Sequence, residues 1–439
     1  MQNNKYTRLI KLKDNWRKIK RHVFVLSLGL LCGLIGFYFS YSKYSTKQET
    51  EVVRTTVGDF ISGDVVLAYS IDGVKGSDAF PKQNTGYEGV SVTCDNEATA
   101  TWDNTIWSIK MTNPGNGKRV KCNVEFKSQE TKTISGITFK LNTFSPDFSK
   151  SACSGCKTTE AGVFAMEDDY GTSYYYRGSV ENNYVDFAGK TWKIIRINGD
   201  GSVRIILNDT IGTSSFNDKY NDNAYVGYMY GTPGSSSYEE THKNVNDSNL
   251  KKVIDTWYEN NIKTSYVSYL ADAGFCGDRY SLQKNSASGS GKTVTYYAVY
   301  GRMVASLPGL KCPQTADLFT TSSSSIGNKA LKYPIATITA DEAMFSGIPG
   351  GVFDGAWTYT KKSLNYLNIS ASFWTMTSFG FYVSYEGDIT QTYSVLVNYA
   401  GGFDDYSSGN ILYVRPVVNL RSDAIKSGNG EVNTPYKVA

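Results

Sequence analysis

The alternation of apolar and polar residues separates a long apolar run near the beginning of the chain from two stretches of strand-like pattern. In the first stretch, residues 61–127, short runs such as "DVVLAYSID" and "TIWSIKMTN" alternate or run apolar and are broken by Gly, Asn and Pro. Runs of this kind predict short β-strands joined by turns. Four or more of them predict a small β-sandwich, with Trp102 and Trp107 in its core rather than on a ligand platform.

The second stretch, residues 159–439, mixes strand and helix patterns and predicts an α+β domain. "NGDG" at 198–201 lies between two β-rich runs and is a strong hairpin-turn signal. Apolar residues at helical spacing in "DSNLKKVIDTWYENNI" predict a helix with Asp247 or Ser248 as its N-cap. "ITADEAMFSG" predicts a short helix capped by Thr339. Strand patterns return in "SFWTMTSF", "TYSVLVNYA" and "ILYVRPVVNLRS", where Arg415 is expected to tether the last strand.

The apolar run "VFVLSLGLLCGLIGFYFSY" covers residues 23–41 without a charge, which is long enough for a transmembrane helix. Residues 1–22 are rich in Lys and Arg, so they are expected to form a basic cytoplasmic tail, with the bulk of the chain outside. The alternative is a cleaved signal peptide, but the run ends in bulky aromatic residues instead of a small-residue cleavage site. Residues 42–60 are polar and are expected to form a stalk.

Charge and cysteine content restrict the possible functions. Beyond residue 22 acidic and basic residues nearly balance, so the charge gives no sign of nucleic-acid binding. Six cysteines follow the apolar run, and an even number in an exported segment indicates disulfides, for which fifteen pairings exist. Proximity and domain limits favour three of these pairs: Cys94–Cys122, Cys153–Cys156 and Cys276–Cys312.

The Cys153–Cys156 pair lies in a Ser/Lys-rich connector over residues 128–158. A thioredoxin-like redox motif would open a helix after a strand, which this context does not offer. A zinc site would need a second cysteine pair at matching spacing. A structural disulfide is therefore the favoured interpretation, and no metal or cofactor is expected.

Several segments of the second stretch resemble a known protein family. "YYYRGSVENNYVDFAGKTWKIIRINGDGSVRIIL", "YPIATITADEAMFSG", "SFWTMTSF" and "VRPVVNLRSDAIKSGNGEVNTPY" resemble uncharacterised surface proteins of Firmicutes and related gut bacteria. The order of these parts is similar to the C-type-lectin-like fold, which formylglycine-generating enzymes share. The resemblance covers about residues 159–439 and implies no established activity. The sequence lacks the calcium-binding motifs of lectins in this domain and has no cysteine after Cys312, which argues against the enzyme activity of the relatives.

Catalytic constellations are scarce in the sequence. The only histidines are His22, beside the apolar run, and His242, which is expected to be a solvated loop residue. Sites that need two histidines outside the membrane are therefore excluded. Paired carboxylates such as Asp341–Glu342 and Asp404–Asp405 could serve glycoside hydrolysis, but neighbouring residues point in different directions. Helix N-terminal electrostatics explain Asp341 and Glu342 better. We therefore expect a protein that is not an enzyme.

Two loops, predicted over residues 352–373 and 379–412, carry aromatic residues among Asp, Ser, Asn and Gly. Such surfaces stack on sugars or act as protein hot spots, although some of these rings could simply pack on a sheet. The stretch "NYAGGFDDYSSGN" at 398–410 has the composition of an antibody contact loop. We expect a non-catalytic, membrane-anchored surface protein that binds a glycan or protein ligand, with a cell-envelope carbohydrate-active enzyme and a structural surface-layer component as alternatives. The candidate ligand-binding residues are Trp357, Tyr359, Tyr382, Tyr385, Tyr399, Phe403, Asp404, Asp405 and Tyr406.

Overall fold

The structure, a computed structural model, divides the chain into two compact units at Lys127 and Ser128. It describes residues 65–76, 80–83, 86–104, 106–113, 119–142, 145–152, 161–283, 287–350, 365–383, 390–397 and 402–438. No helix in these ranges is long and apolar enough to cross a membrane. The predicted apolar span at 23–41 lies outside them, as does the predicted Cys153–Cys156 pair.

The first unit is all-β, as its alternating pattern predicts. Its strands are β1 (Val65–Ile71), β2 (Val74–Lys75), β3 (Tyr87–Cys94), β4 (Thr99–Asp103), β5 (Ser108–Asn113) and β6 (Val120–Ser128). They form a four-stranded sheet in the order β2-β1-β6-β3 and a β4–β5 hairpin, with apolar residues from both packed in one cluster. Trp102 and Trp107 pack edge to face at 5.4 Å in the core, and the predicted Cys94–Cys122 disulfide joins β3 to β6.

The second unit is an α+β unit built on two larger sheets. Its strands are β7 (Thr131–Ile134), β8 (Ile137–Lys140), β9 (Gly162–Asp168), β10 (Gly171–Arg177), β11 (Tyr184–Phe187), β12 (Lys190–Ile197), β13 (Val203–Leu207), β14 (Thr213–Ser215), β15 (Met229–Tyr230), β16 (Asn246–Asp247), β17 (Leu270–Ala271), β18 (Phe275–Cys276), β19 (Thr295–Tyr296), β20 (Leu318–Phe319), β21 (Ile335–Ala336), β22 (Phe373–Val383), β23 (Thr390–Val397), β24 (Phe403–Ser407), β25 (Ile411–Tyr413), β26 (Val417–Leu420), β27 (Ile425–Ser427) and β28 (Tyr436–Val438). Its helices are η1 (Asn223–Val226), α2 (Tyr238–Thr241), α3 (Asn249–Asn261), η2 (Val267–Tyr269), α4 (Ala298–Ala305), η3 (Thr315–Asp317) and α5 (Ala340–Phe345).

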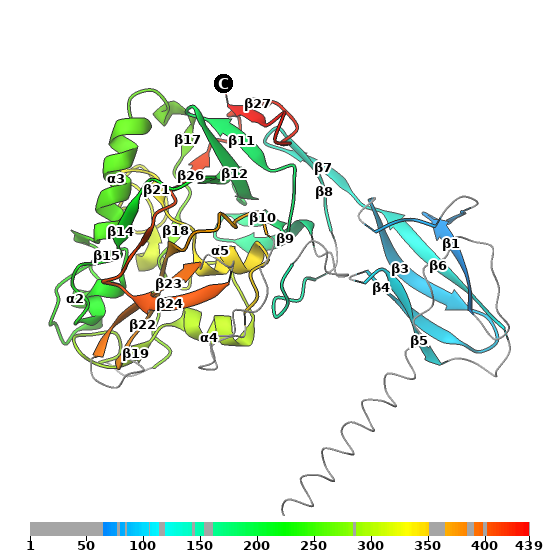
Figure 1. The fold of residues 1–439 in the computed structure, drawn as a ribbon, viewed down its shortest axis with the longest axis horizontal. Helices are drawn as coiled ribbons and strands as arrows, with labels where there is room; N and C mark the ends of the chain where they lie inside the picture. The colour runs from blue at the N-terminus through cyan, green and yellow to red at the C-terminus, as the bar shows by residue number, and fades with distance from the viewer. Residues whose placement is uncertain are drawn as a thin grey trace, which may run out of the picture. The chain divides into compact units, whose positions relative to one another are not determined.

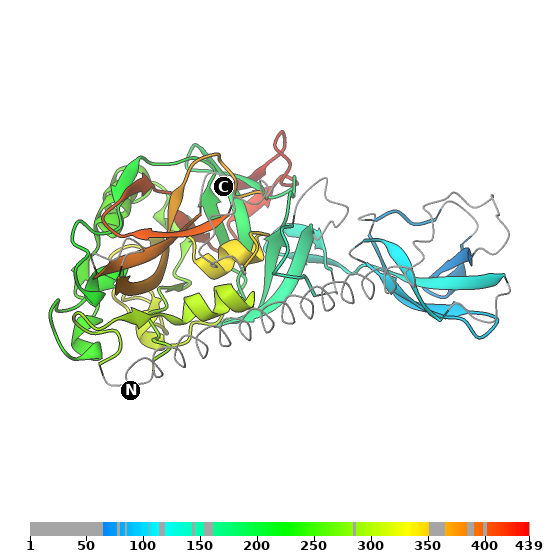
Figure 2. The same cartoon turned by 60° about the horizontal axis from the view of Figure 1, so that its bottom comes forward.

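The two sheets meet in a shared core. In the ten-stranded sheet the main path is β17-β26-β13-β12-β11-β28-β27, and in the six-stranded sheet it is β14-β25-β22-β23-β24. One cluster of buried side chains draws residues from both sheets, among them Trp192 of β12 and Trp374 of β22. Helices α4 and α5 pack against β22 and β23, which are among the orange strands of Figure 1. Figure 2 shows the same arrangement from another side.

Local signals in the sequence fix several elements of this unit. The 198–201 turn joins β12 to β13, and Gly201 has the positive φ of +81° that such a turn requires. Ser248, one of the two predicted caps of α3, accepts a hydrogen bond from the Lys251 N–H at 3.1 Å. Thr339 caps α5 in a reciprocal capping box with Glu342. Arg415 tethers the chain before β26 by donating to the Leu207 carbonyl.

Other predictions need correction. Within the connector predicted for 128–158, residues 131–140 form the β7–β8 hairpin, whose Ile137 and Phe139 are buried in the core of the second unit. The loop predicted for 379–412 is largely sheet, because β22, β23 and β24 occupy most of its described residues. His242 is not solvated: it is 6% exposed and lies beneath the ring of Tyr238.

Candidate functional site

The described part of the 398–410 stretch contains a strand, β24, followed by a turn over residues 408–410. β24 pairs antiparallel with β23 over five residues and ends the main path of the six-stranded sheet. Because side chains alternate along a strand, Phe403 and Asp405 project to one face of the sheet and Asp404 and Tyr406 to the other. The four candidate residues of β24 therefore divide into two pairs with different surroundings.

Phe403 and Asp405 face a stack of tyrosine rings. Tyr382 of β22 lies between Tyr393, with ring centroids 4.2 Å apart, and Tyr296, at 5.2 Å. The Tyr382 hydroxyl donates a hydrogen bond to the Asp405 carboxylate, and Phe403 packs against the same cluster. The structure thus brings together three of the predicted residues. It also adds Tyr296 and Tyr393, which the sequence analysis did not single out.

Asp404 and Tyr406 project to the other face of the sheet, where Asp404 is half-buried. Tyr406 is 42% exposed. Tyr220, which is 39% exposed, lies where β24 ends: its carbonyl accepts from the Thr392 N–H at 2.8 Å, and its ring lies against Gly409. Two partly exposed tyrosine rings therefore lie near this end of β24, and only Tyr406 was predicted from the sequence.

The two aspartates of β24 are half-buried carboxyl groups whose pKa values are raised. Burial and, to a smaller extent, the neighbouring Asp405 carboxylate together raise the pKa of Asp404 to about 7. Burial also raises the pKa of Asp405. No Lys or Arg of the described ranges forms an ion pair with either carboxylate. One structural explanation is that charges on an edge strand discourage pairing with another strand. The same carboxylates are also available to accept hydrogen bonds from a ligand.

We use the name β24 surface for Asp404 and Tyr406, which share one face of β24, together with the nearby Tyr220. The other predicted residues of the contact surface lie outside the described ranges: Trp357, Tyr359, Tyr385 and Tyr399. Tyr366 of the predicted 352–373 loop is 3% exposed and belongs to the core.

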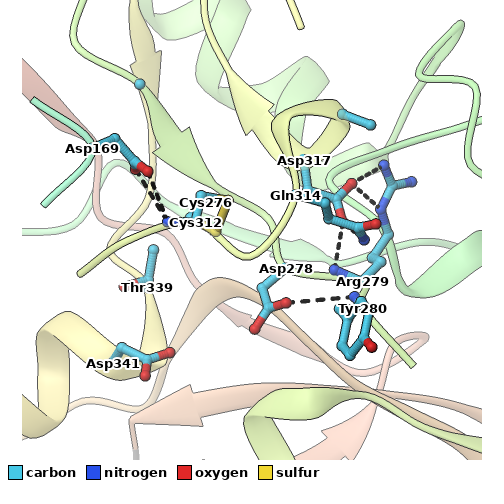
Figure 3. Close-up of a disulfide and its surroundings, with 12 residues drawn as sticks. Asp169, Cys276, Asp278, Arg279, Tyr280, Cys312, Gln314, Asp317, Thr339 and Asp341 are labelled. Atoms are coloured by element: carbon cyan, nitrogen blue, oxygen red, sulfur yellow. Dashed lines mark hydrogen bonds and ion pairs between the residues drawn. A yellow bond between two sulfur atoms is a disulfide. The ribbon is translucent and has the colours of Figure 1, made fainter. Parts of the chain in front are cut away.

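A second cluster of functional groups surrounds a narrow hollow near the Cys276–Cys312 disulfide, which we call the charged hollow. Its charged lining includes Asp169, Arg196, Arg204, Asp278, Arg302, Asp341 and Glu342. Figure 3 shows Asp278 and Asp341 on separate elements near the disulfide, and Asp169 beside Cys312. The Cys312 N–H donates to both oxygens of the Asp169 carboxylate at 3.1 Å.

Arginines hold most of these carboxylates. Arg302 of α4 donates to Asp278 at 2.5 Å and to Asp341 at 2.7 Å. Glu342 accepts from Arg204 at 2.5 Å and from Arg196 at 3.1 Å. Although burial opposes it, the two arginines lower the pKa of Glu342 to about 2. Glu342 is therefore a permanent anion whose role is to link α5 to β12 and β13.

Asp278 also pairs with an arginine, but its pKa shifts in the opposite direction to that of Glu342. Burial raises its pKa to about 6 and outweighs the opposing effect of Arg302, whose charge is shared with Asp341. Burial also raises the pKa of Asp169. No group of three or more potential metal ligands occurs among the residues that the structure describes. The charged hollow is thus a network of ion pairs with one carboxyl, Asp278, that titrates near pH 6.

The arginines of this network were not predicted from the sequence. The sequence did carry a sign of buried ion pairs, because Arg196 and Arg204 interrupt the apolar runs "KIIRI" and "VRIIL" of two buried strands. A charge inside such a run requires a buried partner. Burial lowers the pKa of His242, the one histidine of the described ranges, to about 3, so it remains neutral and is a poor proton acceptor.

A scan against models of known protein families finds no match for this chain. Searches of curated proteins and of solved structures find none either. Its function is therefore inferred from the residues and geometry of these two sites.

Proposed function

We propose that the second unit is a non-catalytic binding module and that the β24 surface contacts a glycan or protein ligand. The observation that carries this proposal is that the exposed Tyr406 ring and the half-buried Asp404 carboxyl lie on one face of β24, with the exposed Tyr220 near the end of the strand. Tyrosine rings offer apolar faces to sugar C–H groups and to protein side chains. Unpaired carboxylates accept hydrogen bonds from hydroxyl or amide donors, which gives the contact its orientation.

The alternative, a carbohydrate-active enzyme of the cell envelope, has less support. Glycoside hydrolysis needs one carboxyl as acid and a second as base or nucleophile, both free to reach the substrate. In the charged hollow Asp278 and Asp341 bond to the same arginine, and Glu342 bonds to two others. These ion pairs hold all three carboxyl groups within the network, so none is free to reach a substrate.

We further propose that the binding module is displayed outside the cell. Support comes from the apolar run at 23–41 and the basic residues before it. The two disulfides of the described residues favour an oxidising compartment. The resemblance to bacterial surface proteins with a C-type-lectin-like unit agrees with this placement. The two-sheet α+β architecture is compatible with that fold class.

The test uses the full-length chain and compares two tyrosines of similar exposure. Tyr406→Ala removes a ring of the β24 surface, and Tyr280→Ala removes a ring that is 44% exposed on another loop. Glycan-array and whole-cell binding are measured for both variants and the parent protein. We expect Tyr406→Ala to weaken binding by about 10-fold or more, because contact aromatics often carry over 1 kcal/mol, and Tyr280→Ala to leave it unchanged.

A second variant, Asp404→Asn, tests the polar part of the contact and keeps the size of the side chain. If neither Tyr406→Ala nor Asp404→Asn differs from the Tyr280→Ala control, the β24 surface is not the binding site. If the protein binds no glycan and no cell surface, the binding proposal itself is wrong.

A further inference from the structure

A shallow groove runs along the outer side of helix α3, on an element that contributes nothing to the β24 surface. Two neighbouring stripes of the helix line it, with Lys252, Thr256 and Asn260 on one and Val253, Trp257 and Asn261 on the other. Ile211 closes its far side. We use the name α3 groove for these residues. The four-residue spacing within each stripe places them side by side on one face of the helix.

Trp257 provides the floor of the α3 groove. It is half-buried and packs against the main core, where its ring meets Trp192 edge to face at 6.1 Å. The core contact holds the indole ring in one orientation. A fixed, partly exposed indole is a suitable platform for the apolar face of a sugar ring, because little conformational freedom is lost on binding.

The polar groups around this platform are available for hydrogen bonds. Thr256 donates to the Lys252 carbonyl and Asn261 to the Trp257 carbonyl, which leaves the side-chain oxygen of each as an acceptor. Within the described ranges, no hydrogen bond or ion pair involves the Asn260 amide or the Lys252 ammonium. Alternating donors and acceptors beside an aromatic ring match the hydroxyl groups of a carbohydrate.

The charge of the groove selects among carbohydrates. Its lining contains one ammonium group, Lys252, and no carboxylate. The carboxylates of the same helix are already engaged: Asp255 pairs with the buried Lys251 at 2.6 Å, and Glu259 pairs with Lys332 at 2.8 Å. No carboxylate of the described residues pairs with Lys252, so its charge complements an anionic group on the ligand.

We propose that the α3 groove binds an acidic carbohydrate, in which a sugar ring stacks on Trp257 and its carboxylate pairs with Lys252. Asn260 and Asn261 then hydrogen-bond the hydroxyl groups of the same or the adjacent ring. This site shares no residue with the β24 surface, so an experiment can refute either binding proposal without refuting the other. A single cation suits one carboxylate better than a polyphosphate chain, which requires several.

The experiment titrates the full-length protein with a tetrasaccharide of alternating glucuronic acid and N-acetylglucosamine and measures binding by calorimetry. The same tetrasaccharide with its carboxyl groups reduced to alcohols is the neutral comparison. We expect the acidic form to bind more tightly than the reduced form. The difference should shrink as salt concentration rises, because an exposed ion pair is screened.

Lys252→Gln and Lys219→Gln form the matched pair of variants, since both remove one exposed lysine charge. We expect Lys252→Gln to weaken binding of the acidic form about 2- to 5-fold, the range of an exposed ion pair, and Lys219→Gln to have no effect. Trp257→Leu should weaken both forms about 10-fold or more, and Trp257→Phe by less. Should Trp257→Leu lower the unfolding temperature, Lys252→Gln and Asn260→Ala decide, because both side chains are exposed.

Absence of binding by the acidic tetrasaccharide overturns the proposal. Equal affinity for the acidic and reduced forms, or equal behaviour of the two lysine variants, also overturns it. Because none of these variants touches the β24 surface, a loss that is confined to Tyr406→Ala would concern the proposed function and not the α3 groove.

Discussion

Asp278 offers the sharpest test of the electrostatics of the charged hollow. The perturbation is Asp278→Asn, which keeps the size and the acceptor oxygen of the side chain but removes its negative charge. Asp278 is 2% exposed, and burial raises its pKa from 3.8 to about 6 even though Arg302 donates to it. Charges on the surrounding elements are Arg302 on α4, Asp341 on α5, and Arg279 and Asp317, which form their own ion pair.

The sign follows from the direction of the shift. A carboxyl whose folded-state pKa is raised is favoured in its neutral form, so its contribution to stability is full below about pH 4 and is lost as pH rises through 6. A shift of about 2 pKa units corresponds to about 3 kcal/mol at ~1.4 kcal/mol per unit. We therefore expect the free energy of unfolding of the parent protein to fall by about 2 to 3 kcal/mol more than that of Asp278→Asn between pH 4 and pH 7.

The assay is urea unfolding of the full-length protein at several pH values, followed by tryptophan fluorescence. Other titrating carboxylates affect parent and variant alike and cancel in the difference. Asp423→Asn is the control, because Asp423 is exposed and its pKa is lowered, which places its effect below this pH window. A pH-independent difference between parent and Asp278→Asn would refute the reasoning. A difference that increasingly favours the parent as pH rises would show that pairing with Arg302 outweighs burial.

Three further predictions concern stability. Glu342→Gln should lower the free energy of unfolding by about 3 to 5 kcal/mol, because it removes the anion of the buried Arg204 and leaves Arg196 with Asp168 alone, whereas Glu259→Gln, at a solvated ion pair, should have a much smaller effect in the same urea titration. Replacing Cys276 and Cys312 by serine opens a loop of 36 residues and should cost about 4 kcal/mol, which thermal unfolding with and without reductant would check. Ser248→Ala removes the cap of α3 and should cost about 1 kcal/mol, measured by chemical unfolding against Ser248→Asn, which retains a capping acceptor.

The parts of the fold that were predictable are those that neighbouring residues decide. The cap of α3, the capping box of α5 and the turn after β12 depend on hydrogen bonds and backbone angles within a few residues. The Cys94–Cys122 and Cys276–Cys312 disulfides also followed from short separations along the chain. Of the β24 surface, sequence alone indicated Asp404 and Tyr406 by composition, and it also indicated Tyr382 and Asp405, which lie on the opposite face.

The parts that failed depend on contacts between distant segments. A Gly- and Ser-rich stretch such as 398–410 matches an exposed loop by composition, yet Phe403–Ser407 becomes a strand because β23 offers it a hydrogen-bonding edge. His242 lies in a polar sequence but is buried, because Tyr238 and Tyr297 close over it. Tyr238 lies only four residues before His242, but neither Tyr297 nor the edge of β23 is visible in the local pattern.

The sequence by itself determined the caps of α3 and α5, the turn after β12, the cysteine pairs of the described units, and which residue types are available for binding. Only the tertiary structure decided which charges meet. Arg196, Arg204 and Glu342 are separated by up to 146 residues, yet one carboxylate serves both arginines. The same packing left Asp404 and Asp405 without a described cation and Lys252 without an anion. Ion pairing and burial depend on distance in space, and the sequence specifies that distance only through the whole fold.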